Sequence, residues 1–294
     1  MIETAASRPA TSYGEALERA RAFMALDDES ILPLAHTQLL DHGERRPNAV
    51  VLIHGFTNHP GQYVKFAPMV FERGANVFVP RMPEHGDRNR MTNRLASLTA
   101  EAYLASAMEA VDIACGLGER VSVLGISTAG LLAAYCGQFR RDVHTAVPVS
   151  PVFAVLQLPY GVSTLLARIV RALPNFWMWW DARIREAQHP KTAYPRYPTH
   201  ALMQCLRIGD LVYATAKDQA ARAGSIVTVV NRVDPAVNNA VTSNVVLEWR
   251  GNRRDGIAYD EMRSLPENHD IIDPDNPLAR IDVVYPKLLE ALAL

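Results

Sequence analysis

The segment Val121-Ser-Val-Leu-Gly125-Ile126-Ser127-Thr128-Ala129-Gly130 decides the fold. It opens with an apolar run typical of a buried strand, and residues 128–139 continue it as a helix. A serine therefore stands where a strand turns directly into a helix, with small residues on both sides. Such a turn holds the serine in a strained backbone conformation and places the positive end of the helix dipole beside it. The segment predicts either a nucleophilic serine or an ordinary strand–helix junction capped by serine.

The usual pattern around a nucleophilic serine of this kind is Gly-x-Ser-x-Gly, whereas this chain has Gly125-Ile-Ser127-Thr-Ala129. Replacing the second glycine by alanine adds one methyl group, which is a mild departure. These five residues alone do not separate the two interpretations, so the rest of the chain must decide.

Strands and helices alternate around this segment. Strands are expected at 49–53, 76–80, 121–125 and 144–149, a leading helix at 12–26, and helices at 62–73, 98–116 and 128–139. Residues 31–40 could form an early strand pair. This order predicts an α/β fold with a mostly parallel central sheet flanked by helices and right-handed crossovers. We expect residues 1–151 and 219–294 to form this core.

The alternation breaks at residues 152–218, which contain no clean buried strand. Helical stretches at 163–173 and 199–222 predict a helical cap, or lid, inserted over the sheet. Three of the chain's four tryptophans gather inside it: Trp177, Trp179 and Trp180. They are either the core of the cap or the apolar wall of a substrate pocket. Strands at 225–230 and 244–249 and a closing helix at 282–294 then resume the α/β pattern.

Composition excludes several classes of protein. The 294 residues carry 30 Lys and Arg against 31 Asp and Glu, so the net charge of −1 gives no reason to expect nucleic acid or an anionic membrane as a partner. Three cysteines without a Cys-x-x-Cys pair fit neither a disulfide scaffold nor a cysteine-rich zinc site. The N-terminal residues lack the apolar core of a signal peptide, and no apolar run approaches the ~18 residues of a membrane span. We expect a cytoplasmic globular protein.

The dipeptide His54-Gly55 directly follows the strand at 49–53. A backbone N–H of this loop can stabilise an oxyanion together with one at the start of the helix after the serine. Phe56 and Thr128 are the candidate amide donors, and we expect His54 to brace the loop rather than transfer protons. The alternative is a simple glycine turn.

In this architecture the catalytic acid and histidine follow the serine in that order. Asp234 comes directly after the strand at 225–230, and His269 is the only histidine after it. Asp255, Asp260 and Asp270 are weaker candidates because none follows a buried strand. The alternatives are an Asp-Pro turn and a surface histidine.

With Ser127, Asp234, His269 and the His-Gly-Phe segment in place, the chain resembles the α/β-hydrolase superfamily over residues 49–294. It is most similar to the carboxylesterase and monoacylglycerol-lipase-type branch, which carries a helical cap. The segment Pro80-Arg-Met-Pro-Glu-His-Gly-Asp87 is also similar to an Arg-x-x-Gly-His-Gly loop of that branch, with glutamate where glycine is commoner.

The resemblance implies a serine hydrolase that cleaves small apolar esters, of short- to medium-chain acyl or monoacylglycerol type, through an acyl-enzyme and without a cofactor. It implies Ser127 as nucleophile, His269 as general base and then acid, and Asp234 as the residue that orients the imidazole. Hydrolysis of amide or C–C bonds on the same residues stays open, as does a hydrolase-like protein that binds a small ligand without turnover. Aspartate replaces the serine in haloalkane dehalogenases and epoxide hydrolases, so those branches are disfavoured.

Neither a metal nor a dinucleotide is expected. The pairs His54 with His59 and His85 with Asp87 lack a third ligand and the His-Glu-x-x-His spacing. The turn after the strand at 49–53 lacks the glycine pattern that binds a dinucleotide.

Overall fold

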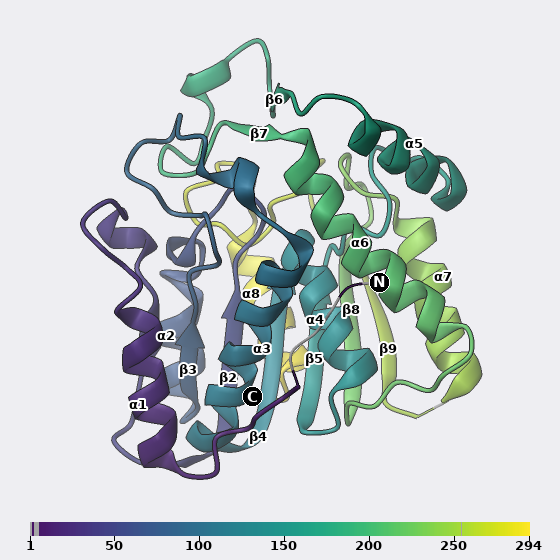
Figure 1. Cartoon of the computed structure of the whole chain (residues 1–294). Helices are drawn as coiled ribbons and strands as arrows, with labels where there is room; N and C mark the ends of the chain where they lie inside the picture. The colour runs from purple at the N-terminus through teal and green to yellow at the C-terminus, as the bar shows by residue number, and fades with distance from the viewer. Residues whose placement is uncertain (1, 3–5, 254) are drawn as a thin grey trace.

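The computed structural model describes residues 2, 6–253 and 255–294. Its centre is a seven-stranded sheet in the order β1-β3-β2-β4-β5-β8-β9, in which all neighbours are parallel except β1 and β3 (Figure 1). The strands are β1 (Gln38–Leu40), β2 (Arg46–Ile53), β3 (Asn76–Val79), β4 (Gly118–Ile126), β5 (Val143–Val149), β8 (Ser225–Asn231) and β9 (Ile257–Met262). The predicted α/β architecture with a mostly parallel sheet is confirmed.

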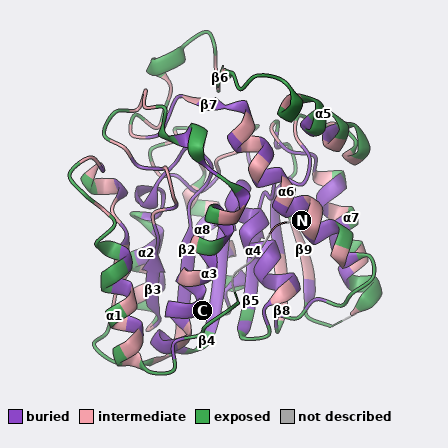
Figure 2. Ribbon diagram, viewed as in Figure 1, coloured by how far each residue is buried: buried purple, intermediate pink, exposed green. Residues whose placement is uncertain are grey.

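Helices cover both faces of the sheet, because its central strands are apolar on both sides. The α-helices are α1 (Tyr13–Met24), α2 (Phe66–Glu72), α3 (Ala100–Leu117), α4 (Thr128–Phe139), α5 (Tyr160–Ala172), α6 (Thr199–Ala216), α7 (Asn239–Asn252) and α8 (Ile281–Ala291). In β2, Val51 and Ile53 pack on the side of α3 and α4, and Val50 and Leu52 pack on the side of α2 and α8. The central strands are accordingly largely buried in Figure 2.

Single-turn 3-10 helices and two short strands complete the fold. The 3-10 helices are Pro33–Ala35, Pro60–Tyr63, Arg94–Ser97 and Arg185–Ala187. Of the strand pair expected at 31–40, only β1 is a strand, and the helix expected at 62–73 is divided between a 3-10 turn and α2.

The prediction of a strand at 244–249 is wrong. These residues lie inside α7, whose first turn is capped by the Asn238 side chain, which accepts hydrogen bonds from the amides of Ala240 and Val241. The buried residues Val241, Val245 and Trp249 recur every four positions, which is helical spacing. The last strand is β9, at the edge of the sheet, where most side chains are half-exposed.

The insertion at residues 152–218 is not purely helical. The tryptophan segment forms β6 (Trp177–Trp179), which pairs antiparallel with β7 (Arg196–Pro198) in a ribbon separate from the main sheet. Helix α5 is largely exposed above the sheet, whereas α6 packs against α4 of the core (Figures 1 and 2). Within the described part of the chain, no helix is long and apolar enough to cross a membrane.

Candidate active site

Ser127 occupies the sharp turn between β4 and α4 with φ 62° and ψ −119°, a conformation that L-residues rarely adopt. The surrounding small residues make this turn possible. A Cβ on Gly125 would lie 2.2 Å from the carbonyl oxygen of Ala129, and one on Gly130 would lie 2.9 Å from Cα of Pro151. Glycine at 125 therefore lets β4 and α4 approach each other closely, and glycine at 130 lets α4 approach the chain just after β5, while the Ala129 methyl is accommodated in the core.

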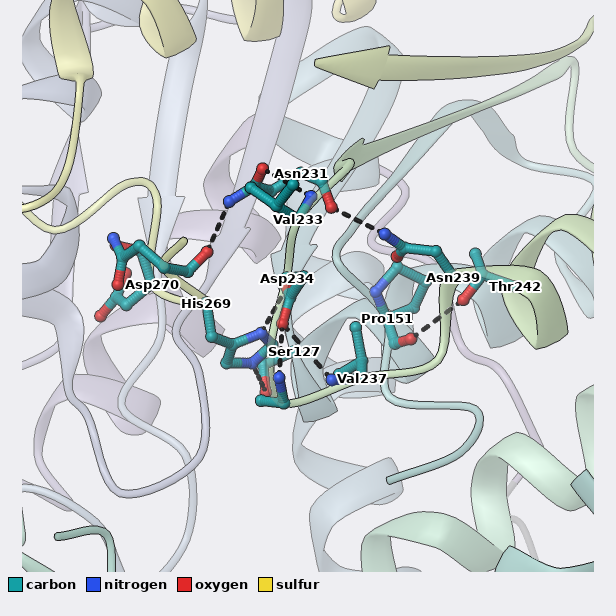
Figure 3. Close-up of polar contacts among 12 residues, drawn as sticks. Ser127, Pro151, Asn231, Val233, Asp234, Val237, Asn239, Thr242, His269 and Asp270 are labelled. Atoms are coloured by element: carbon teal, nitrogen blue, oxygen red, sulfur yellow. Dashed lines mark hydrogen bonds and ion pairs between the residues drawn. The ribbon is translucent and has the colours of Figure 1, made fainter. Parts of the chain in front are cut away.

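Three side chains from distant parts of the chain form one line of hydrogen bonds. His269 Nε2 lies 2.8 Å from Ser127 Oγ, and His269 Nδ1 lies 2.7 Å from Asp234 Oδ2 (Figure 3). An ionised carboxylate only accepts hydrogen bonds, so Nδ1 carries the proton and Nε2 is free to accept one from the serine. This is the arrangement that a general base needs beside a serine hydroxyl.

The surroundings of Asp234 fix its orientation. Its Oδ1 accepts hydrogen bonds from the amides of Ala236 at 2.9 Å and Val237 at 3.3 Å, which leaves Oδ2 for the histidine. Its side chain is fully buried. Of the weaker acid candidates, Asp255 is exposed and Asp260 pairs with Lys287 at 3.1 Å. The structure thus brings Asp234, and neither of those two, to the imidazole.

The charge distribution around His269 favours its protonated form. Burial lowers the pKa of the imidazole, but the charge of Asp234 and its hydrogen bond, together with the charge of Asp270, outweigh burial and raise the pKa above its ordinary value. The imidazole can therefore hold the proton of the serine during attack.

The side chain of His54 fixes the loop at residues 54–58 through two hydrogen bonds. Its Nε2 accepts the amide proton of Met82 at 3.0 Å, so Nδ1 carries the ring proton and donates to the carbonyl of Gly55 at 3.0 Å. The amide of Asn58 donates to the same carbonyl at 3.1 Å. Because a trans peptide unit is planar, anchoring this carbonyl turns the N–H of Phe56 the opposite way. His54 is neutral, since burial lowers its pKa well below the usual range.

The second candidate amide donor, beside that of Phe56, belongs to Thr128, the first residue of α4. The first N–H groups of a helix have no acceptor within the helix, and they carry its positive partial charge. Gly55, Phe56 and Ser127 all line one cavity beside this helix end.

Two side-chain amides that the sequence analysis missed connect this loop to the loop that carries His269. Gln62 accepts from the Gly55 amide at 2.8 Å and donates to Asp270 at 2.9 Å. Asn58 donates to Asp270 at 3.3 Å and to Asp273 at 2.8 Å. These partners lie more than 200 positions apart, so only the polar character of the segment after His54-Gly55 could have pointed to them.

Two aspartates that follow His269 lie close to each other, because Asn58 donates to both; Asp270 is half-buried and Asp273 is buried. Burial raises the pKa of Asp270, and burial and the neighbouring Asp270 raise the pKa of Asp273 to about 7. Asn231, the last residue of β8, donates to the carbonyls of Pro266 and Asn268 at 2.9 and 2.7 Å and so holds the same loop from its other side.

The cavity has a volume of about 430 Å³, and Ser127 and His269 both contribute to its wall. Apolar lining residues include Phe56, Trp180, Ile184 and Leu278, and the polar ones include Asn58, Asn268 and Asp270. Of the three tryptophans considered from the sequence, Trp180 lines the cavity. Among the described lining residues, Trp177 and Trp179 do not occur; Arg196 covers the first ring at 4.4 Å and Arg185 the second at 5.9 Å.

The loop at residues 80–87 has a left-handed residue where glycine is commoner in similar loops. Glu84, which stands where glycine is commoner, has a φ of 66°. This left-handed conformation explains the usual glycine. Tyr194 of the insertion braces the loop: its hydroxyl donates to the Glu84 carbonyl at 3.2 Å and accepts from the Asp87 amide at 2.8 Å. Among the described residues, no group of three or more His, Cys, Asp or Glu could hold a metal ion.

A parallel sheet flanked by helices, with a strained serine at a strand–helix turn and a histidine and a buried aspartate beside it, defines the class of α/β-hydrolases. A model of the Alpha/beta hydrolase family matches residues 50–286. The chain belongs to this family.

Individual relatives have low sequence identity. The chain is 24% identical over 167 residues to a thermostable monoacylglycerol lipase of Bacillus sp. (strain H-257). These aligned residues make up 57% of this chain and 64% of that protein. The match thus spans less than two thirds of the relative.

Solved structures share the fold. A structure described with the metagenome-derived lipolytic enzymes LipS and LipT has a TM-score of 0.65 at 18% identity and covers 90% of this chain and 99% of its own. The monoacylglycerol lipase of Paleococcus ferrophilus has a TM-score of 0.65 at 17% identity and covers 87% of this chain and 97% of its own. In fold the chain therefore resembles lipases and esterases.

Proposed function

We propose that the protein hydrolyses carboxylic esters through an acyl-enzyme on Ser127. The observation that carries the proposal is the continuous hydrogen-bond line from Ser127 Oγ through His269 to Asp234, with distances of 2.8 and 2.7 Å. A serine hydroxyl is a weak nucleophile, and an imidazole at this distance removes its proton as it attacks.

Each step uses the same three groups. Ser127 Oγ attacks the ester carbonyl carbon, its proton passes to His269 Nε2, and the electron pair of the carbonyl bond moves to oxygen. Collapse of this tetrahedral intermediate breaks the bond to the alcohol oxygen, which takes the proton from Nε2. Water then attacks the acyl-serine in the same way, and the carboxylic acid leaves. Asp234 holds the tautomer and stabilises the imidazolium throughout.

The amides of Phe56 and Thr128 are the proposed donors to the tetrahedral oxyanion. They come from two loops that meet at the serine, and anchoring of the Gly55 carbonyl and the start of α4 orient them in advance. Such preorganised donors act most strongly where charge develops in the transition state.

The proposed substrates are short- to medium-chain esters or monoacylglycerol-like esters. The cavity combines an apolar wall, with Trp180, Ile184 and Leu278, and a polar wall, with Asn58, Asn268 and Asp270. The first suits an acyl chain and the second suits a hydroxylated alcohol. The similarity to monoacylglycerol lipases supports this class of substrate.

We propose the insertion at residues 152–218 as the cap of this site. The three free cysteines are consistent with the cytoplasm as its location.

The experiment is a panel of esters, amides and β-diketones offered side by side, with release of p-nitrophenol from a short-chain ester followed on the millisecond scale. An ester-specific rate with an initial burst of about one equivalent supports the acyl-enzyme. Preferred cleavage of the amide or the diketone would replace the proposed reaction, and binding without turnover on any substrate would replace the enzyme by a binding protein.

A further inference from the structure

Thr57 stands in a backbone conformation that its side chain disfavours. The Asn58 amide donates to the Gly55 carbonyl at 3.1 Å, so residues 55–58 form a turn with Thr57 at its third position. Its φ is 64°, in the region where glycine or asparagine is the usual residue. A β-branched residue persists there only if surrounding contacts offset the strain.

Those contacts come from the insertion. The indole Nε1–H of Trp180 donates to Thr57 Oγ1 at 2.8 Å, and the amide of Tyr194 donates to the Thr57 carbonyl at 2.9 Å. Both donors lie in the segment that connects β6 to β7, more than 120 positions from the turn. The insertion therefore holds Thr57, the one strained residue of this turn, by hydrogen bonds to both the side chain and the backbone of Thr57.

Trp180 and a second aromatic residue of the insertion, Tyr197, also pack against Phe56, the neighbour of Thr57. The ring of Phe56 meets Trp180 edge-on at 6.2 Å and Tyr197 at 5.7 Å, and those two rings lie 4.3 Å apart. Phe56 thus has its ring held by the insertion and its following peptide held through Thr57. Its preceding peptide is anchored by His54 and Asn58.

We infer that Thr57 and Trp180 are positioning residues that let the insertion set the direction of the Phe56 amide. The inference rests on the proposed function, since it concerns the amide that would receive the oxyanion. An oxyanion donor acts on the transition state far more than on the bound ester. Loss of the hydrogen bond between Trp180 and Thr57 should therefore lower kcat and leave KM nearly unchanged. A role in holding the ground-state ester would raise KM instead.

The test uses Thr57→Val, which keeps the branched shape and removes the hydroxyl, and Trp180→Phe, which removes the indole N–H. We expect each to lower kcat for a soluble p-nitrophenyl ester about tenfold. For Thr57→Val, KM should change less than about twofold. The double variant should be no slower than the slower single one, because both substitutions break the same bond. Thr57→Ser retains the hydroxyl and should keep kcat within about twofold of the wild type.

Trp249→Phe is the matched control, because Trp249 Nε1 donates to Gln138 Oε1 at 2.7 Å in the core away from the cavity. Its kcat per folded molecule should equal that of the wild type. A wild-type kcat in Thr57→Val, an equal loss in Thr57→Ser, or independent losses that multiply in the double variant would overturn the inference. Ser127→Ala in the same series separates the two proposals: if it keeps wild-type activity, the proposed function fails, whatever the Thr57 variants do.

Discussion

Nε2 of His269 lies 2.8 Å from Oγ of Ser127, although 142 positions separate the two residues in the chain. The serine is placed by the end of β4 and the start of α4, and the histidine by a loop that follows β9. Because the carboxyl ends of parallel strands meet at one edge of a sheet, both residues arrive there from the topology alone. Their separation is set further by the side chains that hold the histidine loop, Asn231 and Gln62 among them.

Exchange of the acid should distinguish Asp234 from other aspartates. Asp234→Asn should lower kcat by about 10⁴-fold, because an amide can hold the imidazole in the wrong tautomer. Asp255→Asn is the matched control, since Asp255 is exposed, and its kcat should stay near the wild-type value. Small and equal losses in both variants would mean that another residue serves as the acid.

The pH dependence of kcat/KM should report His269. Its raised pKa keeps the imidazole protonated, and unable to accept the serine proton, to a higher pH than an ordinary histidine. We therefore expect kcat/KM to fall as the pH drops through a midpoint above the ordinary histidine value of about 6.5. A midpoint at or below that value in an initial-rate profile would contradict the assigned environment.

The same shift affects stability with a defined sign. A histidine with a raised pKa in the folded state stabilises the protein below its ordinary pKa, and this contribution is lost as the pH rises through the folded-state value. Urea unfolding of wild type and His269→Gln across this range should show a difference in free energy that shrinks with rising pH. A difference that grows with pH would refute the assignment.

Acyl-chain preference should depend on Trp180 and not on the neighbouring tryptophans. One methylene in an apolar pocket is worth roughly 1–3 kcal/mol. Trp180→Ala should therefore change the ratio of kcat/KM values between esters of different chain length by about tenfold. Trp177→Ala and Trp179→Ala should keep the wild-type order, because arginines rather than the cavity contact their rings. A ratio of kcat/KM values between chain lengths cancels any loss of rate common to all esters. An unchanged order in Trp180→Ala would place the acyl pocket elsewhere.

Gly125 should not tolerate a side chain. Its Cβ would lie 2.2 Å from a backbone oxygen of α4, so Gly125→Ala should cost about 2 kcal/mol or more of unfolding free energy in urea. Gly161→Ala is the matched control, since nothing lies within 4 Å of its Cβ in α5, and it should be neutral or slightly stabilising. Similar stabilities for the two variants would show that the strand and helix can move apart.

The elements that the sequence predicted well have strong local signals. Helix α4 has its predicted bounds of 128–139, because a glycine-flanked turn and a run of small apolar residues define it. The strand expected at 244–249 was wrong because Val245, Val246 and Leu247 are apolar in succession, which outweighed the signs of a helix, the capping Asn238 and the four-residue spacing of Val241, Val245 and Trp249. Strand β9 was missed because it is a half-exposed edge strand that carries Asp260 and Glu261.

The site divides in the same way. Ser127 and Asp234 could be selected because each follows a strand that the sequence predicts, and His269 because it is the only histidine after Asp234. The hydrogen bonds from Trp180 to Thr57 and from Gln62 to Asp270 could not be predicted, because they join segments that come together only in the folded chain. Nor could the sequence separate Trp180 from Trp177 and Trp179, since the path of the ribbon decides which ring reaches the cavity.

The most direct measurement is kcat/KM for p-nitrophenyl butyrate in wild type and Ser127→Ala, with equal unfolding midpoints as proof of an intact fold. If Ser127 is the nucleophile, the variant loses activity by about 10⁴-fold or more while the wild type turns over the ester. A Ser127→Ala protein that retains a rate close to the wild type would contradict the account.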